Sequence, residues 1–133
     1  MKSIKISIPS LIENIKIVES FIDNAREKFQ INDDIYGNIM ISVTECVSNA
    51  IVHGNQGDAN KAVNLEVNFL ENQLKFIIED EGKGFDYDNL KDPTAPENLE
   101  KSGGRGVFIM KHLSDEVDFE NDGKKTILTF YMN

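Results

Sequence analysis

Several features that define whole protein classes are scarce in this sequence. Its 133 residues include one cysteine, Cys46, which excludes an internal disulfide framework and any metal site built from several cysteines. No apolar run approaches the roughly 18 residues that a membrane span needs. The first six residues alternate in polarity, whereas a signal peptide has an apolar block. We therefore expect one domain over residues 1–133 that works in the cytoplasm without contacting a membrane.

Basic residues are also few. The chain carries 14 of them against 23 acidic residues, for a formal net charge of −9, and no run of Lys or Arg marks a basic patch. Such a chain repels polyphosphates at long range, so we expect no nucleic-acid partner. No Walker sequence is present either. A phosphate ligand would have to be held by backbone amides, a metal ion and one or two basic side chains.

Polarity patterns are clear enough to predict the order of elements. Alternation predicts strands at about 2–8, 63–69, 74–80, 117–119 and 126–131, with tight turns at 71–72 and 121–123. Helical spacing predicts helices at about 10–29, 33–53 and from 106 onward. We expect Ser10 and Glu13 to form a capping box and Gly54 to end the second helix. The fold class is α+β, a two-layer α/β sandwich with the helices on one face of a mixed, mostly antiparallel sheet.

The segment from about 87 to 104 has little periodicity. It contains Pro93 and Pro96 and many polar residues, and it is long for a passive connection. We interpret it as a lid.

The second predicted helix carries three polar residues at helical spacing. Glu45, Asn49 and His53 are four residues apart, so they stack along one side of that helix. An amide oxygen such as that of Asn49 is a good ligand for Mg²⁺, and Glu45 is placed to accept a proton. Two alternatives stay open here. Glu45 and Asn49 fit a solvated helix face equally well, and His53 fits a cation at the helix end.

An acidic residue follows the third predicted strand. Asp80 has the same parity as the apolar residues of that strand, so its carboxylate points to the covered side of the sheet. There it can accept a hydrogen bond from an exocyclic amine such as that of adenine. Gly82 and Gly84 would let the backbone approach a flat base closely. Thr126 has the matching parity on the last strand and can complete a polar pair. The alternative is an ordinary turn after a strand.

A glycine cluster precedes the third predicted helix. Gly103, Gly104 and Gly106 leave backbone amides exposed at a helix N-terminus, where phosphate binds well. Lys101 and Arg105 are candidates for contacting a γ-phosphate. A flexible hinge and solvated basic side chains are the alternatives.

Taken jointly, the three segments resemble the conserved boxes of the Bergerat-fold (GHKL) ATPases, the group of gyrase, histidine kinase catalytic domains and heat-shock chaperone ATPases. The N box is matched by Glu45, Asn49, Ala50, His53 and Gly54, the G1 box by Asp80, Gly82, Gly84 and Phe85, and the G2 box by Gly104 and Gly106. Within that group the sequence is most similar to the bacterial anti-sigma regulatory factors, which are small serine/threonine protein kinases. The similarity covers nearly the whole chain.

The resemblance implies a Bergerat, or histidine-kinase-like ATPase, fold that binds ATP with Mg²⁺. It assigns the metal to Asn49, the catalytic base to Glu45 and adenine to Asp80. The wider nucleotide site takes in His53, Phe85, Val107, Thr126 and the residues of the glycine cluster. The implied partners are a sigma factor and an anti-sigma antagonist, which is phosphorylated on a serine, and the implied assembly is a homodimer.

Three functional hypotheses are compatible with these residues. The leading one is a kinase that inhibits a sigma factor and switches partners. The second is a nucleotide-gated binding module without phosphotransfer, against which the presence of Glu45 counts. The third is an excised histidine kinase catalytic domain. The chain has little room for the helix pair that carries the phosphoacceptor histidine, which counts against this hypothesis.

Overall fold

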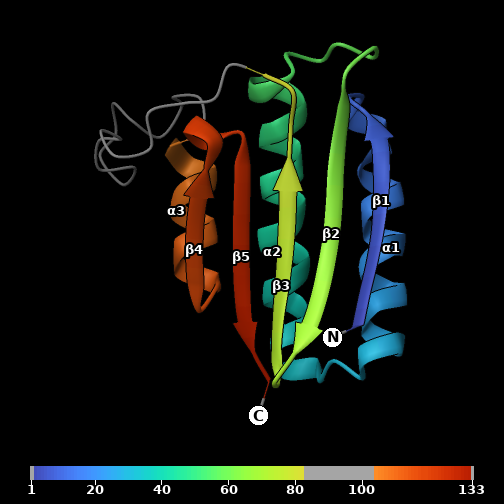
Figure 1. The fold of residues 1–133 in the computed structure, drawn as a ribbon, viewed down its shortest axis with the longest axis vertical. Coiled ribbons are helices and arrows are strands. Elements are labelled where there is room, and N and C mark those ends of the chain that lie inside the picture. Colours follow the sequence, from blue (N-terminus) through green and yellow to red (C-terminus); the bar gives the residue numbers. More distant parts are fainter. Residues whose placement is uncertain (1, 83–103, 133) are drawn as a thin grey trace.

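A computed structural model describes residues 2–82 and 104–132, and these form two layers. Five strands form one sheet in the order β1-β2-β3-β5-β4, and all four described strand pairs are antiparallel. Figure 1 shows the helices α1, α2 and α3 behind this sheet. The predicted α+β sandwich with helices on one face is therefore confirmed. The predicted lid lies outside the described residues, apart from Gly104.

The elements follow the predicted order. The strands are β1 (Lys2–Pro9), β2 (Ala62–Leu70), β3 (Gln73–Glu79), β4 (Glu116–Glu120) and β5 (Lys125–Tyr131). The helices are α1 (Ile15–Phe29), α2 (Asp33–Asn49) and α3 (Gly104–Leu113). A π-helical turn, η2 (Ala50–Gly54), continues α2, and short 3₁₀ turns occupy η1 (Ile12–Asn14) and η5 (Asn121–Gly123).

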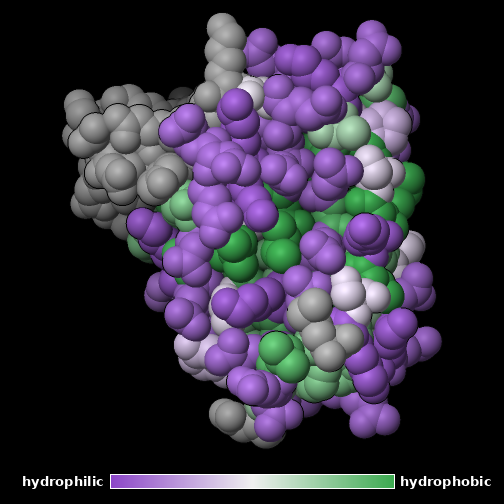
Figure 2. Space-filling model, in the orientation of Figure 1, coloured by the Kyte–Doolittle hydropathy of each residue, from purple (hydrophilic) through white to green (hydrophobic). Residues whose placement is uncertain are grey.

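The core lies between the helices and the covered face of the sheet. Phe76 of β3 and Phe130 of β5 are fully buried there, with ring centroids 6.0 Å apart and planes at 87°. Burying one such side chain contributes about 2–3 kcal/mol, which makes the central strands the best-anchored part of the sheet. The face of the sheet that the helices leave uncovered is more polar. Figure 2 shows a mostly hydrophilic surface with an apolar patch near its middle.

The helix and π turn over Asp33–Gly54 are long and apolar enough, by length and composition, to cross a membrane. In this fold they form the central core helix. Ile39, Val43 and Val47 are fully buried on its inner side, and α2 contacts α1, α3, β3 and β5. Contacts within the protein therefore explain the apolar residues on the inner side of α2.

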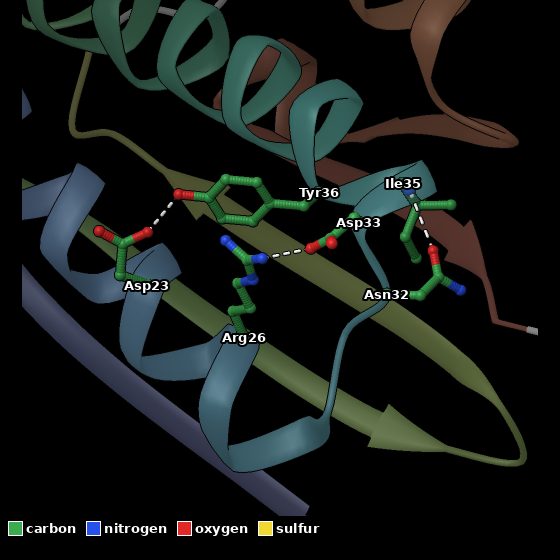
Figure 3. A network of polar contacts seen from close by, with 6 residues as sticks. All are labelled: Asp23, Arg26, Asn32, Asp33, Ile35 and Tyr36. Atoms are coloured by element: carbon green, nitrogen blue, oxygen red, sulfur yellow. Dashed lines mark hydrogen bonds and ion pairs between the residues drawn. The ribbon is translucent and has the colours of Figure 1, made fainter.

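The helical hairpin of α1 and α2 is closed by exposed polar contacts (Figure 3). Arg26 forms an ion pair with Asp33, and its guanidinium carbon lies 4.2 Å from the centroid of the Tyr36 ring. The Tyr36 hydroxyl donates to Asp23. Asn32 caps α2 by accepting a hydrogen bond from the Ile35 amide at 3.1 Å.

Two predicted helix caps are wrong. The Ser10 hydroxyl caps no helix, because it donates to the Lys61 carbonyl at 2.7 Å, and the chain enters α1 through η1 without a side-chain cap. The second helix does end at Gly54, but Gly54 is the last residue of the π turn and has no left-handed backbone. Among the glycines that the structure describes, positive φ occurs at Gly57 and Gly123.

Candidate functional site

The C-terminal end of α2 presents the predicted acid and amide. Glu45 and Asn49 lie one helical turn apart and are both half-buried, as their spacing predicts. His53 lies in the π turn and is exposed. The spacing that places Glu45 and Asn49 on one side of α2 is confirmed, whereas the place of His53 in the same site stays a prediction.

The π turn lies directly against the segment after β3. A Cβ added to Gly54 would lie 2.5 Å from Oδ2 of Asp80, and one added to Gly82 would lie 1.9 Å from the Gly54 carbonyl oxygen. Non-bonded atoms do not approach this closely. Gly82 faces backbone, so this position requires glycine, whereas a side chain at Gly54 would have to displace the Asp80 carboxylate. The end of the N-box segment and the start of the G1 segment are thus packed backbone against backbone.

Asp80 lies at the edge of this contact as a partly buried carboxylate. Its amide donates to the Lys124 carbonyl at 2.9 Å, which extends the β3–β5 ladder by one residue. Its Oδ1 accepts a hydrogen bond from the Gly82 amide at 2.8 Å. Burial raises the pKa of Asp80, while the Gly82 hydrogen bond acts in the opposite direction. The second oxygen, Oδ2, can accept a hydrogen bond from an amine.

Two further side chains link Asp80 to α2 and β5. Thr126 is buried on the covered face, opposite Ile78 in the strand register, as the parity argument predicts. Burial raises the pKa of the Cys46 thiol to about 12. A hydrogen bond with Thr126 opposes that shift, and the charge of Asp80 adds to it. Cys46, Thr126 and Asp80 are therefore neighbours at the sheet end of the site.

The N-terminus of α3 meets α2 at Asn49. A Cβ added to Gly106 would lie 2.1 Å from the side-chain amide nitrogen of Asn49, so any larger residue there would displace the Asn49 side chain. Val107 follows and is buried in the core. Gly104 and Arg105 contribute backbone to that turn, whose leading amides have no partner inside the helix. The predicted Gly84, Phe85, Lys101 and Gly103 lie outside the described residues.

The arrangement fits a nucleotide with Mg²⁺. A carboxylate that can accept from an amine lies at the sheet end, and a helix N-terminus that suits phosphate lies beside Asn49. Within residues 2–82 and 104–132, no group of three His, Cys, Asp or Glu side chains is placed to hold a metal. This is compatible with Mg²⁺, which is usually held by one or two protein oxygens together with phosphates and water.

A comparison with known protein families identifies the family of this chain. A family model described as a histidine kinase-like ATPase domain matches residues 8–132. The chain belongs to this family. The matched range contains every described residue of the site, and the resemblance carried by the three boxes is confirmed.

Two relatives of this ATPase domain are named as serine-protein kinases. The chain is 27% identical over 137 aligned positions to a protein named serine-protein kinase RsbW from Bacillus subtilis (strain 168), an alignment that covers 98% of this chain and 86% of the relative. It is 28% identical over 131 positions to serine-protein kinase RsbW from Staphylococcus aureus (strain JH9), covering 93% and 82%. The sequence-based similarity to serine kinases of this kind is therefore confirmed.

A solved structure supports the fold. The structure of the RsbU and RsbW domains of Rv1364c from Mycobacterium tuberculosis superposes with a TM-score of 0.73 at 13% sequence identity. The superposition covers 99% of this chain, which spans 32% of that longer protein. At this identity the likeness supports the histidine kinase-like ATPase fold alone.

Sequence reasoning missed one residue of the site region of this ATPase domain. Asn55, directly after Gly54, is 1% exposed and hydrogen-bonds to three different segments. No periodicity marks it, because it lies just past the last turn of the helix and its partners are distant in sequence. The one signal in the sequence is that Asn55 is a polar residue between the N-box motif and the loop at 56–61.

Proposed function

We propose that this protein is an ATP-binding anti-sigma regulatory factor that acts as a serine/threonine protein kinase. It phosphorylates an anti-sigma antagonist and thereby switches between that antagonist and a sigma factor. The observation that carries the proposal is the meeting of three segments at the end of α2, with Gly106 against Asn49 and Gly54 against Asp80. The named RsbW serine kinases among the relatives support the kind of reaction and of partner.

The residues have distinct roles in this proposal. Asp80, with Thr126 beside it, accepts a hydrogen bond from the adenine amine, and the Gly82 amide holds the Asp80 carboxylate by donating to its Oδ1. The first-turn amides of α3, Arg105 and the lid residues Lys101 and Gly103 hold the phosphates. Mg²⁺, when bound by the Asn49 oxygen together with phosphate oxygens and water, neutralises charge on the phosphates.

Glu45 performs the proton step. Its carboxylate accepts the proton of the antagonist's serine hydroxyl as the serine oxygen forms a bond to the γ-phosphorus of the substrate ATP. The bond from that phosphorus to the β–γ bridging oxygen breaks, and ADP leaves with the electron pair. The products are phosphoserine and ADP.

The proposal also concerns the setting of the reaction. We place the whole range 1–133 in one kinase domain with a lid at about 87–104, and we expect a cytoplasmic homodimer. These statements come from the sequence and from the resemblance.

The first test is calorimetric titration of the protein with ATP, with and without Mg²⁺. We expect micromolar, Mg²⁺-dependent binding, on the order of 8 kcal/mol. The absence of heat under both conditions would contradict the proposal.

The second test is Glu45→Ala in the presence of a serine-bearing antagonist protein. Because the proton acceptor is lost, transfer from γ-³²P-labelled ATP is expected to fall by roughly 10²–10⁴-fold while ATP affinity stays unchanged. Glu66→Ala, a half-buried glutamate on the open sheet face, is the matched control and should transfer normally. Normal transfer by Glu45→Ala would remove Glu45 from the base role. ATP binding without transfer by the unchanged protein would favour the nucleotide-gated module.

A further inference from the structure

Asn55 connects parts of the chain that are far apart in sequence. Its amide nitrogen donates to the Ser10 hydroxyl at 2.7 Å and to the Ala62 carbonyl at 3.0 Å. Its side-chain oxygen accepts from the Glu81 amide at 2.8 Å. With 1% of its surface exposed, the side chain exchanges none of these partners for water.

These contacts form a closed ring across three segments. The Glu81 amide donates to Asn55, the Asn55 nitrogen donates to the Ala62 carbonyl, and the Ala62 amide donates back to the Glu81 carboxylate. The ring joins the end of the π turn, the first residue of β2 and the segment after β3. Ser10 supports it from the end of β1, because its hydroxyl accepts from Asn55 and donates to Lys61.

The side chain at position 55 has to accept one hydrogen bond and donate another, as an amide does. The Glu81 amide requires an acceptor, and the Ala62 carbonyl requires a donor, at opposite ends of one planar group. A carboxylate of the same shape would oppose the Ala62 carbonyl, and an apolar side chain would leave both backbone groups buried without partners.

The ring restrains the residue that separates Asp80 from Gly82. We infer that Asn55 is a positioning residue of the nucleotide site, which fixes Glu81 and thereby holds the Asp80 carboxylate and the Gly82 amide in register with the end of α2. This inference rests on the proposed function, in which Asp80 accepts the adenine amine. Without Asn55 the 80–82 segment would become ordered only when the nucleotide binds. The entropy lost in ordering it would lower the affinity for the nucleotide.

The test compares Asn55→Ala with Ser10→Ala. The control removes another buried member of the same network but leaves the bonds of Asn55 to Glu81 and Ala62 in place. Titration with ATP and Mg²⁺ is carried out well below the unfolding midpoint of each variant, where both are folded by circular dichroism. We expect affinity to fall about tenfold for Asn55→Ala and to stay within about twofold for Ser10→Ala.

A second readout requires no nucleotide. Amide hydrogen exchange of the ligand-free protein should be at least about tenfold faster at Glu81 in Asn55→Ala. Exchange at Asp80, whose amide is bonded to the Lys124 carbonyl, should be unchanged. If Asn55→Ala does not fold, Asn55→Asp replaces it. Its affinity relative to the unchanged protein should improve as pH falls, because a protonated carboxyl regains a donor for Ala62.

The outcomes separate this inference from the proposed function. No ATP binding by the unchanged protein would overturn the proposed function and the inference with it. ATP binding that is equally tight in folded Asn55→Ala, or exchange at Glu81 that does not change, would overturn the inference alone. Equal losses in Asn55→Ala and Ser10→Ala would also overturn it, since they would indicate a general effect of the network.

Discussion

The two ends of α2 use polar groups in opposite ways. At its start, Arg26, Asp33, Tyr36 and Asp23 pair side chain to side chain, and the two ion-pair partners are 40% and 84% exposed (Figure 3). At its end, the buried amide of Asn55 bonds to the backbone of Ala62 and Glu81.

Glycine is also used differently at the two ends. Gly37, in the first half of α2, has no atom within 4 Å of an added Cβ, whereas Gly54, Gly82 and Gly106 have no room for one. At the start of α2, exposed side-chain pairs only connect α2 to α1, and such pairs contribute little to the free energy of unfolding. The end has to hold three backbone segments in one arrangement, and it is there that the candidate site lies.

The largest expected difference between the two ends comes from adding one methyl group to a glycine. Gly82→Ala would place a carbon 1.9 Å from the Gly54 carbonyl, so backbone must move, and we expect a loss of about 3 kcal/mol in unfolding free energy. Gly37→Ala, the matched control, should gain about 0.5–1 kcal/mol because alanine favours the helix. Urea unfolding measures both, and equal effects would contradict the comparison.

A smaller effect is expected from changing Asp80, the partly buried carboxylate that lies against the end of α2. Asp80→Asn should weaken ATP affinity by at least about tenfold, since the acceptor for the adenine amine loses its charge. Calorimetry with ATP and Mg²⁺ checks this. Unchanged affinity would mean that the adenine pocket lies elsewhere.

The same variant makes a prediction about pH. Burial raises the pKa of Asp80, so between the ordinary aspartate pKa and the raised one the native state binds more protons than the unfolded state. The stability that Asp80 contributes is therefore present at low pH and is lost as pH rises through the raised pKa. Relative to the unchanged protein, Asp80→Asn should be most stable near neutral pH and lose that advantage towards about pH 4. Thermal unfolding across this range measures the difference.

The smallest effect is expected at the start of the helix. Arg26→Ala removes an exposed ion pair and a cation–π contact, and it should lower the unfolding free energy by less than about 1 kcal/mol. ATP affinity should not change, because the network lies at the other end of α2. A loss comparable to that of Gly82→Ala would show that the two ends are not as different as their contacts indicate.

Most of the fold follows from local patterns. Alternation identifies all five strands because one face of the sheet is buried, and the turn at 71–72 is marked by an asparagine that tolerates positive φ, here 60°. The two wrong helix caps have one cause. Ser10 and Gly54 have their decisive partners at Lys61 and at Asp80, which are distant in sequence, and local capping rules do not account for such partners.

The site was predictable only in part for the same reason. Spacing along α2 finds Glu45 and Asn49, and strand parity finds Asp80 and Thr126. The π turn that contains His53 depends on the hydrogen bond from the Asn55 amide to the Ala50 carbonyl, at 2.8 Å, and on how Asn55 is held. The positioning role of Asn55 depends on contacts with Ser10, Ala62 and Glu81 that no local pattern encodes.

The position of β5 affects when the protein can fold during synthesis. This last strand lies inside the sheet, paired with β3 on one side and β4 on the other. Until residues 125–131 have left the ribosome, β3 therefore has an unpaired edge and β4 has no strand beside it. The hairpin of β2 and β3 is thus made with one strand edge exposed, and it stays so until β5 pairs with it.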